Sequence, residues 1–414
     1  IVGKFVGNAA LAAVGACGTL VFLIIGFLQG VTAGFTVVTA QHFGAGNMKA
    51  MKKSVASGAV LTGIVTVILT LLSMISMAKV LHLMNTPSDM YGEAYGYIMV
   101  ICGGIVAQAL YNYLASVLRA LGDSKRPLYF LVIAALLNIV LDLVFIIVFR
   151  MGAAGAAYAT VIAQGISAVC CLIYIVKRFP ILHLERKDFE ICWGSFGRLL
   201  KLGIPMGLQF SITAIGTIIV QSAVNIYGPV HMAGFSAAGK IQNIFATVFT
   251  AFGATIATYV GQNRGAGKMD RVKQGVRYTQ MMVLGWSVFV MFLMFFFGKY
   301  LTYLFVDPSE QDVVNVSVTY FRTVFWAYPF LGSIFLYRNT LQGMGYGLVP
   351  MLGGVFELVA RTGIVVLIAG HTSFAGVCMA DPTAWIAALI PLIPYYFHVM
   401  KKYKNKSQVQ AVED

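Results

Sequence analysis

Long apolar segments are the feature that most restricts what this chain can fold into. Blocks of roughly 20 or more mostly apolar residues alternate with short stretches rich in Gly, Pro and charge, and a helix needs about 20 such residues to cross a bilayer. Only 11% of the residues are charged, whereas about 25% is usual in a soluble domain. The sequence therefore predicts an all-α integral membrane protein. Eleven complete spans are expected, with approximate limits 12–41, 54–78, 92–117, 128–149, 152–176, 199–226, 232–260, 276–305, 313–340, 350–369 and 376–398.

An internal repeat divides the chain into two halves. The segment Gln41–Met48 (QHFGAGNM) returns as Gln262–Met269 (QNRGAGKM), a shift of 221 residues. At this shift, or at 223 for the last two pairs, further residues coincide: Gly7 with Gly228, Ala12 with Ala233, Gly18 with Gly239, Gly122 with Gly345, and Pro127 with Pro350. Several matches in order at a nearly constant shift indicate a duplicated unit of roughly 220 residues.

We therefore expect two pseudo-symmetric six-helix lobes. The predicted boundaries are an N-lobe at 1–180, a cytoplasmic linker at 181–198, a C-lobe at 199–400 and a cytoplasmic tail at 401–414. The span that opens the second half would have its counterpart upstream of Ile1. We expect an intact protein of twelve transmembrane helices, of which eleven are complete in this N-terminally truncated chain.

The distribution of Lys and Arg predicts the orientation. If the loops after the two repeated segments are cytoplasmic, the inner loops and tail hold 21 Lys and Arg residues and the outer loops hold four. Loops rich in Lys and Arg stay on the cytoplasmic side, so the C-terminus is expected in the cytoplasm. The expected location is the cell (plasma) membrane. Six spans per half give the halves the same orientation, an arrangement typical of carriers that rock two bundles around a midplane site.

One cluster of polar residues within the spans predicts a cation site. Asn138 and Asp142 are spaced i, i+4 and share a helix face. The next span follows a tight turn around Met151, and Thr160 lies as far after this turn as Asp142 lies before it, roughly 13 Å. A carboxylate, an amide oxygen and a hydroxyl at one depth suit Na⁺, or a proton on Asp142. The alternative is a buried Asp that only holds two helices together.

Other polar residues within the spans are candidates for a substrate cavity. Glu357 and Arg361 form an i, i+4 pair that either neutralises itself as a structural element or lines a polar cavity. Gln209, Gln221 and Asn225 fall on the first span of the second half, where hydrogen bonding between helices is the simpler interpretation.

Several classes of protein are disfavoured by the sequence. The net charge of +14 is spread over short loops without a basic face, so we expect no nucleic-acid partner. The six His residues lack the spacing of metal ligands, and we expect no metal beyond a possible Na⁺. An integral-membrane enzyme would need a convergent cluster of catalytic residues, and we expect neither enzymatic activity nor a cofactor.

Together these segments resemble the multidrug and toxic compound extrusion (MATE) family. The resemblance extends over nearly the whole chain and is carried by IVGKFVGNAALAAVG, QHFGAGN, RALGDSKRP, LGIPMGLQ and GQNRGAGK. It implies twelve helices in two lobes and export of amphipathic, often cationic, compounds driven by inward Na⁺ or H⁺. The partners would be a small-molecule substrate and membrane lipid, and the chain is expected to act as a monomer.

The resemblance also implies which half couples to the ion. One branch of the family has an Asp on helix 1, an Asn-x-x-x-Asp on helix 5 and a Thr on helix 6, and the last three match Asn138, Asp142 and Thr160. The helix 1 Asp would precede Ile1. Another branch has a Glu on helix 7 and an Asp on helix 10, but here Thr213 or its neighbours stand near the first position and no acid falls in 313–340. We therefore expect coupling in the N-lobe. The alternative function is a flippase for lipid-linked saccharides or lipids of the same superfamily.

Overall fold

The computed structural model describes residues 2–84, 86–190, 193–368 and 373–413, and every regular element in these ranges is helical. Within these ranges, nine helices are long and apolar enough to cross a membrane, and a bent helix pair raises the number to ten. The long helices are α2 (Asn8–Gly44), α3 (Met48–Leu83), α6 (Lys125–Leu143), α7 (Gly152–Arg178), α8 (Trp193–Asn225), α9 (Pro229–Gly265), α10 (Met269–Thr302), α13 (Leu348–Ile368) and α15 (Ala380–Glu413). The all-α membrane fold is confirmed, although the expected end of one span at 369 lies outside the described residues.

Two predicted spans are broken helices. The span expected at 92–117 consists of α4 (Ser88–Gly103) and α5 (Ile105–Ala120), which meet at a bend of 45°. The span expected at 313–340 consists of α11 (Gln311–Val324), a 3₁₀ turn at Phe325–Ala327 and α12 (Tyr328–Gly343). The sequence predicts the limits of these two spans but not the breaks inside them.

The two breaks fall at equivalent positions of the repeat. Gly104 ends α4, and a shift of 221 residues leads to Phe325, the first residue of the 3₁₀ turn. In the first half the break accompanies a close approach to α7, because a Cβ atom at Gly104 would lie 2.2 Å from Cγ2 of Val161. In the second half α12 restarts with Pro329 in its first turn, where its missing N–H is tolerated.

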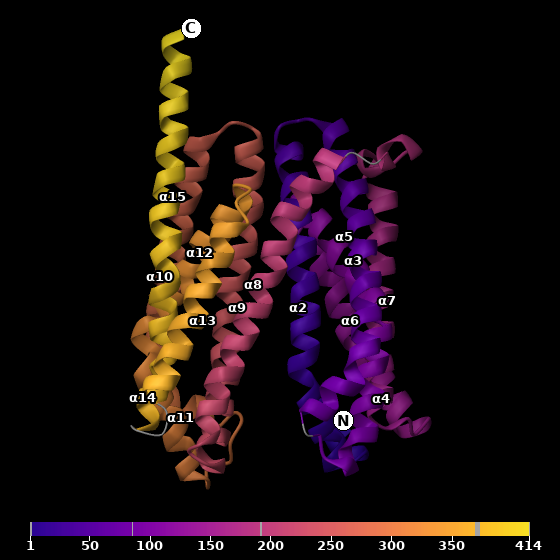
Figure 1. The fold of residues 1–414 in the computed structure, drawn as a ribbon, viewed down its shortest axis with the longest axis vertical. Coiled ribbons are helices and arrows are strands. Elements are labelled where there is room, and N and C mark those ends of the chain that lie inside the picture. The colour runs from indigo at the N-terminus through magenta and orange to yellow at the C-terminus, as the bar shows by residue number, and fades with distance from the viewer. Residues whose placement is uncertain (1, 85, 191–192, 369–372, 414) are drawn as a thin grey trace. The chain divides into compact units, whose positions relative to one another are not determined.

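By its contacts the chain divides into two units, Ile1–Ser211 and Ile212–Asp414. Each unit has its own hydrophobic core, and within each unit the long helices run roughly side by side (Figure 1). The division falls inside α8, whereas the sequence predicts the second lobe from residue 199. The first part of α8 therefore belongs to the packing of the first unit.

Small residues bring this part of α8 close to α2. A Cβ atom at Gly34 would lie 2.6 Å from Cα of Gly203, and one at Gly203 would lie 2.4 Å from the ring of Phe35. Nearby, Arg198 donates a hydrogen bond from Nη2 to Oε1 of Gln41 at 2.8 Å. In lipid no hydrophobic effect drives helices together, and close packing of backbones does so instead. These glycines therefore explain why the first part of α8 packs with the first unit.

The repeated sequence segments form the same turn in both halves. Gly46, between α2 and α3, has φ of 68°, and Gly267, between α9 and α10, has φ of 72°. The N–H of Asn47 donates to the carbonyl of His42 at 3.0 Å, and the N–H of Lys268 donates equivalently to Asn263 at 2.8 Å. A glycine is needed because other residues rarely adopt this left-handed conformation.

Two further glycine pairs of the repeat also have positive φ angles in both halves. Gly7 and Gly228 have φ of 118° and 90°, and Gly122 and Gly345 have φ of 95° and 81°. These four positions were matched by the sequence shift alone. The duplicated unit is therefore present in the backbone as well as in the residues.

The glycine contact between α2 and α8 can be tested with two alanine substitutions. Gly34→Ala is expected to lower stability by about 1–3 kcal/mol, because its methyl group would collide with the backbone of Gly203. Gly63→Ala is the control: Gly63 lies in α3 with nothing within 4 Å of its added Cβ, and alanine favours a helix. The measurement is the thermal unfolding midpoint in detergent. Equal midpoints for the two variants would contradict this packing.

Candidate functional site

The predicted cation-site residues lie on neighbouring helices of the first unit. Asn138 on α6 donates a hydrogen bond from Nδ2 to Oγ1 of Thr160 on α7 at 3.4 Å. The hydroxyl of Thr160 donates in turn to the carbonyl of Ala156 at 2.9 Å. The structure therefore brings together the amide of Asn138 and the hydroxyl of Thr160, whereas the sequence places Thr160 level with Asp142.

Asp142 lies one helical turn beyond Asn138. Its Oδ1 atom is buried and has no hydrogen-bond partner among the described residues. Immediately after Leu143 the helix widens into a π-helical turn at Val144–Val148. Such turns often occur at functional sites, because they redirect side chains and free backbone groups. An acceptor oxygen without a donor, one helical turn from the amide of Asn138, is able to receive a proton or a small cation.

The turn between α6 and α7 is held by a residue from a third helix. Arg150 has φ of 53° and Gly152 has φ of 61°, as a tight turn around Met151 requires. Oε2 of Glu93 on α4 accepts a hydrogen bond from the backbone N–H of Ala153 at 2.7 Å, at the start of α7. This carboxylate satisfies a free donor at the N-terminus of α7 and ties the start of that helix to α4.

The polar residues predicted on α8 do not form one cluster. Gln209 is buried in the part of α8 that belongs to the first unit. Nε2 of Gln221 donates to Oδ1 of Asn225 at 3.0 Å, a bond within one helix. Gln209 and Gln221 are roughly 18 Å apart along the helix axis.

Glu357 and Arg361 belong to a larger buried network in the second unit. Glu357 is 4% exposed, and its Oε1 accepts from Nη2 of Arg338 on α12 at 2.9 Å, whereas its Oε2 is 3.9 Å from Nη1 of Arg361. Nε of Arg361 donates to Oδ1 of Asp381 on α15 at 3.3 Å. The i, i+4 pair is therefore not self-contained, because the closer partner of each member lies on another helix.

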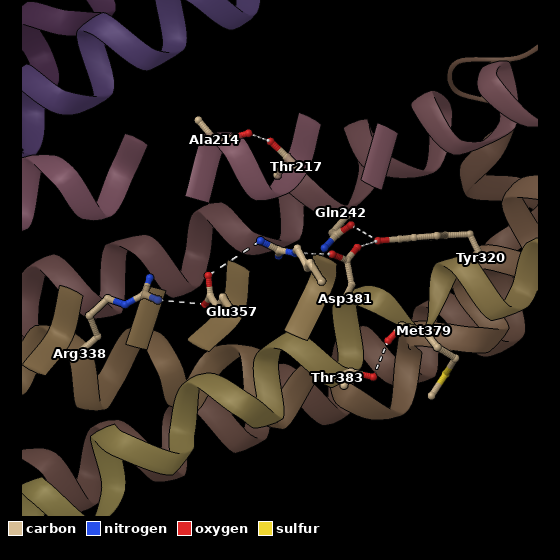
Figure 2. A network of polar contacts seen from close by, with 10 residues as sticks. Ala214, Thr217, Gln242, Tyr320, Arg338, Glu357, Met379, Asp381 and Thr383 are labelled. Atoms are coloured by element: carbon tan, nitrogen blue, oxygen red, sulfur yellow. Dashed lines mark hydrogen bonds and ion pairs between the residues drawn. The ribbon is translucent and has the colours of Figure 1, made fainter. Parts of the chain in front are cut away.

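The same network continues to α11 and α9. The hydroxyl of Tyr320 donates to Oδ2 of Asp381 at 2.8 Å and also bonds Oε1 of Gln242. Figure 2 shows Arg338 reaching Glu357 at one end and Tyr320 pointing to Gln242 and Asp381 at the other. Two cations and two anions make the network neutral overall, which is how charges are tolerated in a low-dielectric interior.

Sequence reasoning missed Asp381, Tyr320 and Gln242. Asp381 could have been found from the sequence, because it is the lone acid within the span predicted at 376–398 and an acid there needs a partner. Tyr320 and Gln242 could not have been found, since nothing in their spacing relates them to one another. Among the described residues, no group of three or more His, Cys, Asp or Glu side chains is placed to hold a metal ion.

Membrane-length helices in two repeated halves, with buried polar residues in each half, are typical of membrane transporters. Within that class the family is identified by its sequence model. The MatE family model matches residues 1–144 and 205–386, and the chain belongs to the MatE family. Members of this family are transporters and not enzymes.

Individual relatives agree with this assignment. The probable multidrug resistance protein YpnP of Bacillus subtilis is 32% identical over 348 residues, which cover 83% of this chain and 76% of that protein. The probable multidrug resistance protein YoeA of the same organism is 26% identical over 421 residues, covering 99% and 90%. A solved outward-facing multidrug resistance MATE transporter of the MOP superfamily is similar in fold, with a TM-score of 0.90 at 21% identity, covering 97% of this chain and 90% of that one.

The buried network predicts a large penalty for removing one of its charges. Arg338→Gln leaves Glu357 with only the more distant Arg361, and breaking a buried pair costs about 3–5 kcal/mol. Arg277→Gln is the control, because Arg277 is exposed on α10. The thermal unfolding midpoint in detergent is the measurement. The double variant Arg338→Leu, Glu357→Leu is expected to recover most of the lost stability, and additive losses would contradict the pairing.

Proposed function

We propose that this protein exports amphipathic, often cationic, small molecules in exchange for Na⁺ or H⁺, by alternating access of its two lobes. Membership of the MatE family and the names of the two Bacillus relatives, both probable multidrug resistance proteins, support export of drug-like compounds. The aliphatic and aromatic surface of the helices suits a substrate with an apolar body. The transported ion is part of the cargo rather than a resident cofactor.

The observation that carries the ion coupling is the unpartnered oxygen of Asp142. This oxygen is buried one turn from the hydrogen-bonded side chains of Asn138 and Thr160. A carboxylate that has one buried oxygen without a donor inside an apolar span is stabilised by binding a cation or a proton. Asp142 therefore supplies the charge, while Asn138 and Thr160 supply neutral oxygens.

Coupling further requires that the site bind the ion in one conformational state and release it in another. The π-helical turn after Leu143 gives α6 a place to change its winding beside Asp142. A small change in this turn would alter the distance between Asp142 and the oxygens on α7. In this proposal the second unit's neutral network stabilises its helices and does not carry the driving ion.

The proposed location is the plasma membrane, with the C-terminus in the cytoplasm and a single chain as the functional unit. The 21-to-4 distribution of Lys and Arg between the two sets of loops supports this orientation.

Removal of the charge on Asp142 tests the coupling. Asp142→Asn keeps the size and hydrogen-bonding ability of the side chain, so folding is expected to stay near normal while gradient-driven efflux is abolished. Asn138→Ala and Thr160→Ala are expected to weaken cation affinity to a lesser degree. The measurement is substrate transport into proteoliposomes under imposed Na⁺ or H⁺ gradients.

Two control variants make this test specific. Asp270→Asn removes an exposed acid in the first turn of α10 and is expected to transport normally. Glu357→Gln is expected to reduce stability or substrate handling while the dependence on Na⁺ and pH is retained. If Asp142→Asn still moves substrate against a gradient with unchanged ion dependence, the site in the first unit does not drive transport.

The orientation can be tested with single cysteines in a variant that lacks the six native ones. Cysteines at Ser195, in the first turn of α8, and at the exposed Ser309, in the loop after α10, are expected on opposite sides of the membrane. An impermeant thiol reagent added to whole cells should label position 309 and spare position 195. The reverse pattern would invert the topology.

A further inference from the structure

A basic pocket lies where α6 begins and α7 ends. It has a volume of about 580 Å³ and is lined by Arg126, Tyr174, Arg178 and Phe179. Asn138 lies twelve residues further along α6, roughly 18 Å away along the helix axis. The pocket is therefore separate from the proposed ion site.

The pocket carries a net positive charge. Arg126 and Arg178 are both exposed, and neither forms an ion pair with a carboxylate in the part of the chain that the structure describes. The nearby Asp123 is already engaged, because Oδ1 accepts from the backbone N–H of Arg126 at 3.2 Å and Oδ2 accepts from the hydroxyl of Tyr174 at 2.9 Å. Two guanidinium groups are thus available to an anion.

Aromatic rings hold the position of one of these groups. The guanidinium carbon of Arg126 lies 5.6 Å from the ring centroid of Tyr174 and 6.0 Å from that of Tyr129. Tyr174 in turn packs edge-on against Phe179 at 5.8 Å. Cation–π contacts of this kind limit the side-chain freedom of arginine, so less entropy is lost when it binds a ligand.

An apolar surface begins directly beside the pocket. On α6 the side chains of Leu128, Val132 and Leu136 are exposed, and on α7 those of Leu172 and Val176 are exposed. In a bilayer these side chains face acyl chains rather than water. A ligand with a charged head at the arginines and an apolar tail would therefore find a continuous surface along the two helices.

We propose that this pocket binds an anionic phospholipid of the cytoplasmic leaflet. The phosphate lies between Arg126 and Arg178, because guanidinium groups donate paired hydrogen bonds to phosphate oxygens. The acyl chains run along the exposed faces of α6 and α7. The Lys and Arg distribution assigns this end of the helices to the cytoplasm, where basic pockets between transmembrane helices bind anionic head groups.

The test measures lipid binding to the full chain in detergent by native mass spectrometry. Dioleoylphosphatidylglycerol is compared with dioleoylphosphatidylcholine, which has the same chains but no net charge. The anionic lipid is expected to bind at least roughly tenfold more tightly, and the double variant Arg126→Gln, Arg178→Gln is expected to abolish most of this preference. The control Lys125→Gln, Lys177→Gln removes the same charge from neighbouring positions outside the pocket and should change affinity less than about threefold.

Three outcomes of this comparison would overturn the proposal. Equal losses in the arginine and lysine variants would mean that general surface charge attracts the lipid. Equal affinity for the two lipids would mean that the head group is not recognised. Displacement of the lipid by inorganic phosphate at similar concentration would mean that the site takes a free anion rather than a membrane lipid.

A second double variant distinguishes a specific loss of lipid binding from misfolding. Arg126→Lys with Arg178→Lys keeps both charges and is expected to bind more of the anionic lipid than the glutamine pair. Thermal unfolding midpoints are measured for every variant. If the lysine pair folds normally but binds no better than the glutamine pair, positive charge is not what holds the lipid, and the proposal fails.

Discussion

A backbone amide in lipid finds no water to bond, and this constraint underlies the whole structure. Each segment that crosses the apolar region has to satisfy its own N–H and C=O groups, which only a helix does within one segment. At the two breaks described above, part of the turn packs against protein. The bend at Gly104 packs on Val161, and the 3₁₀ turn at Phe325–Ala327 contains a buried Ala327. Both halves break the same span at the same point of the repeat.

The two units differ in how their buried charged side chains are paired. The second unit joins Arg338, Glu357, Arg361 and Asp381 into a chain of opposite charges on three helices. The first unit leaves one oxygen of Asp142 without a donor. The network gives each carboxylate a permanent cationic partner, although Nε of Arg338 and Nη1 of Arg361 are themselves buried without a hydrogen bond among the described residues. An acceptor oxygen that has no donor gains free energy when an ion arrives, and this is why we propose ion coupling in the first unit.

Much of the fold could be predicted because it depends on local sequence. Span length and the repeat can be read from apolar blocks and turn glycines. Equal distances from the turn at Met151 placed Thr160 level with Asp142, and the structure shows the hydroxyl of Thr160 bonded to Asn138, one turn earlier on α6. Contacts between helices distant in sequence could not be read in this way. Asp381 meets Arg361 because α13 and α15 are packed together, and no periodicity within either helix encodes that neighbour. The packing of the first part of α8 on α2 depends likewise on Gly34 and Gly203, whose pairing is visible only in three dimensions.

The contacts of Tyr320 have a consequence for the protons of the second unit. A phenol has one hydrogen, yet this hydroxyl faces two acceptor oxygens, those of Gln242 and Asp381. One of the three groups must therefore change role. When the amide of Gln242 turns so that its NH₂ group faces the phenol, the phenol accepts from the amide and donates to Asp381. The three groups then form one directed chain of hydrogen bonds that begins on α9, passes through α11 and ends on α15.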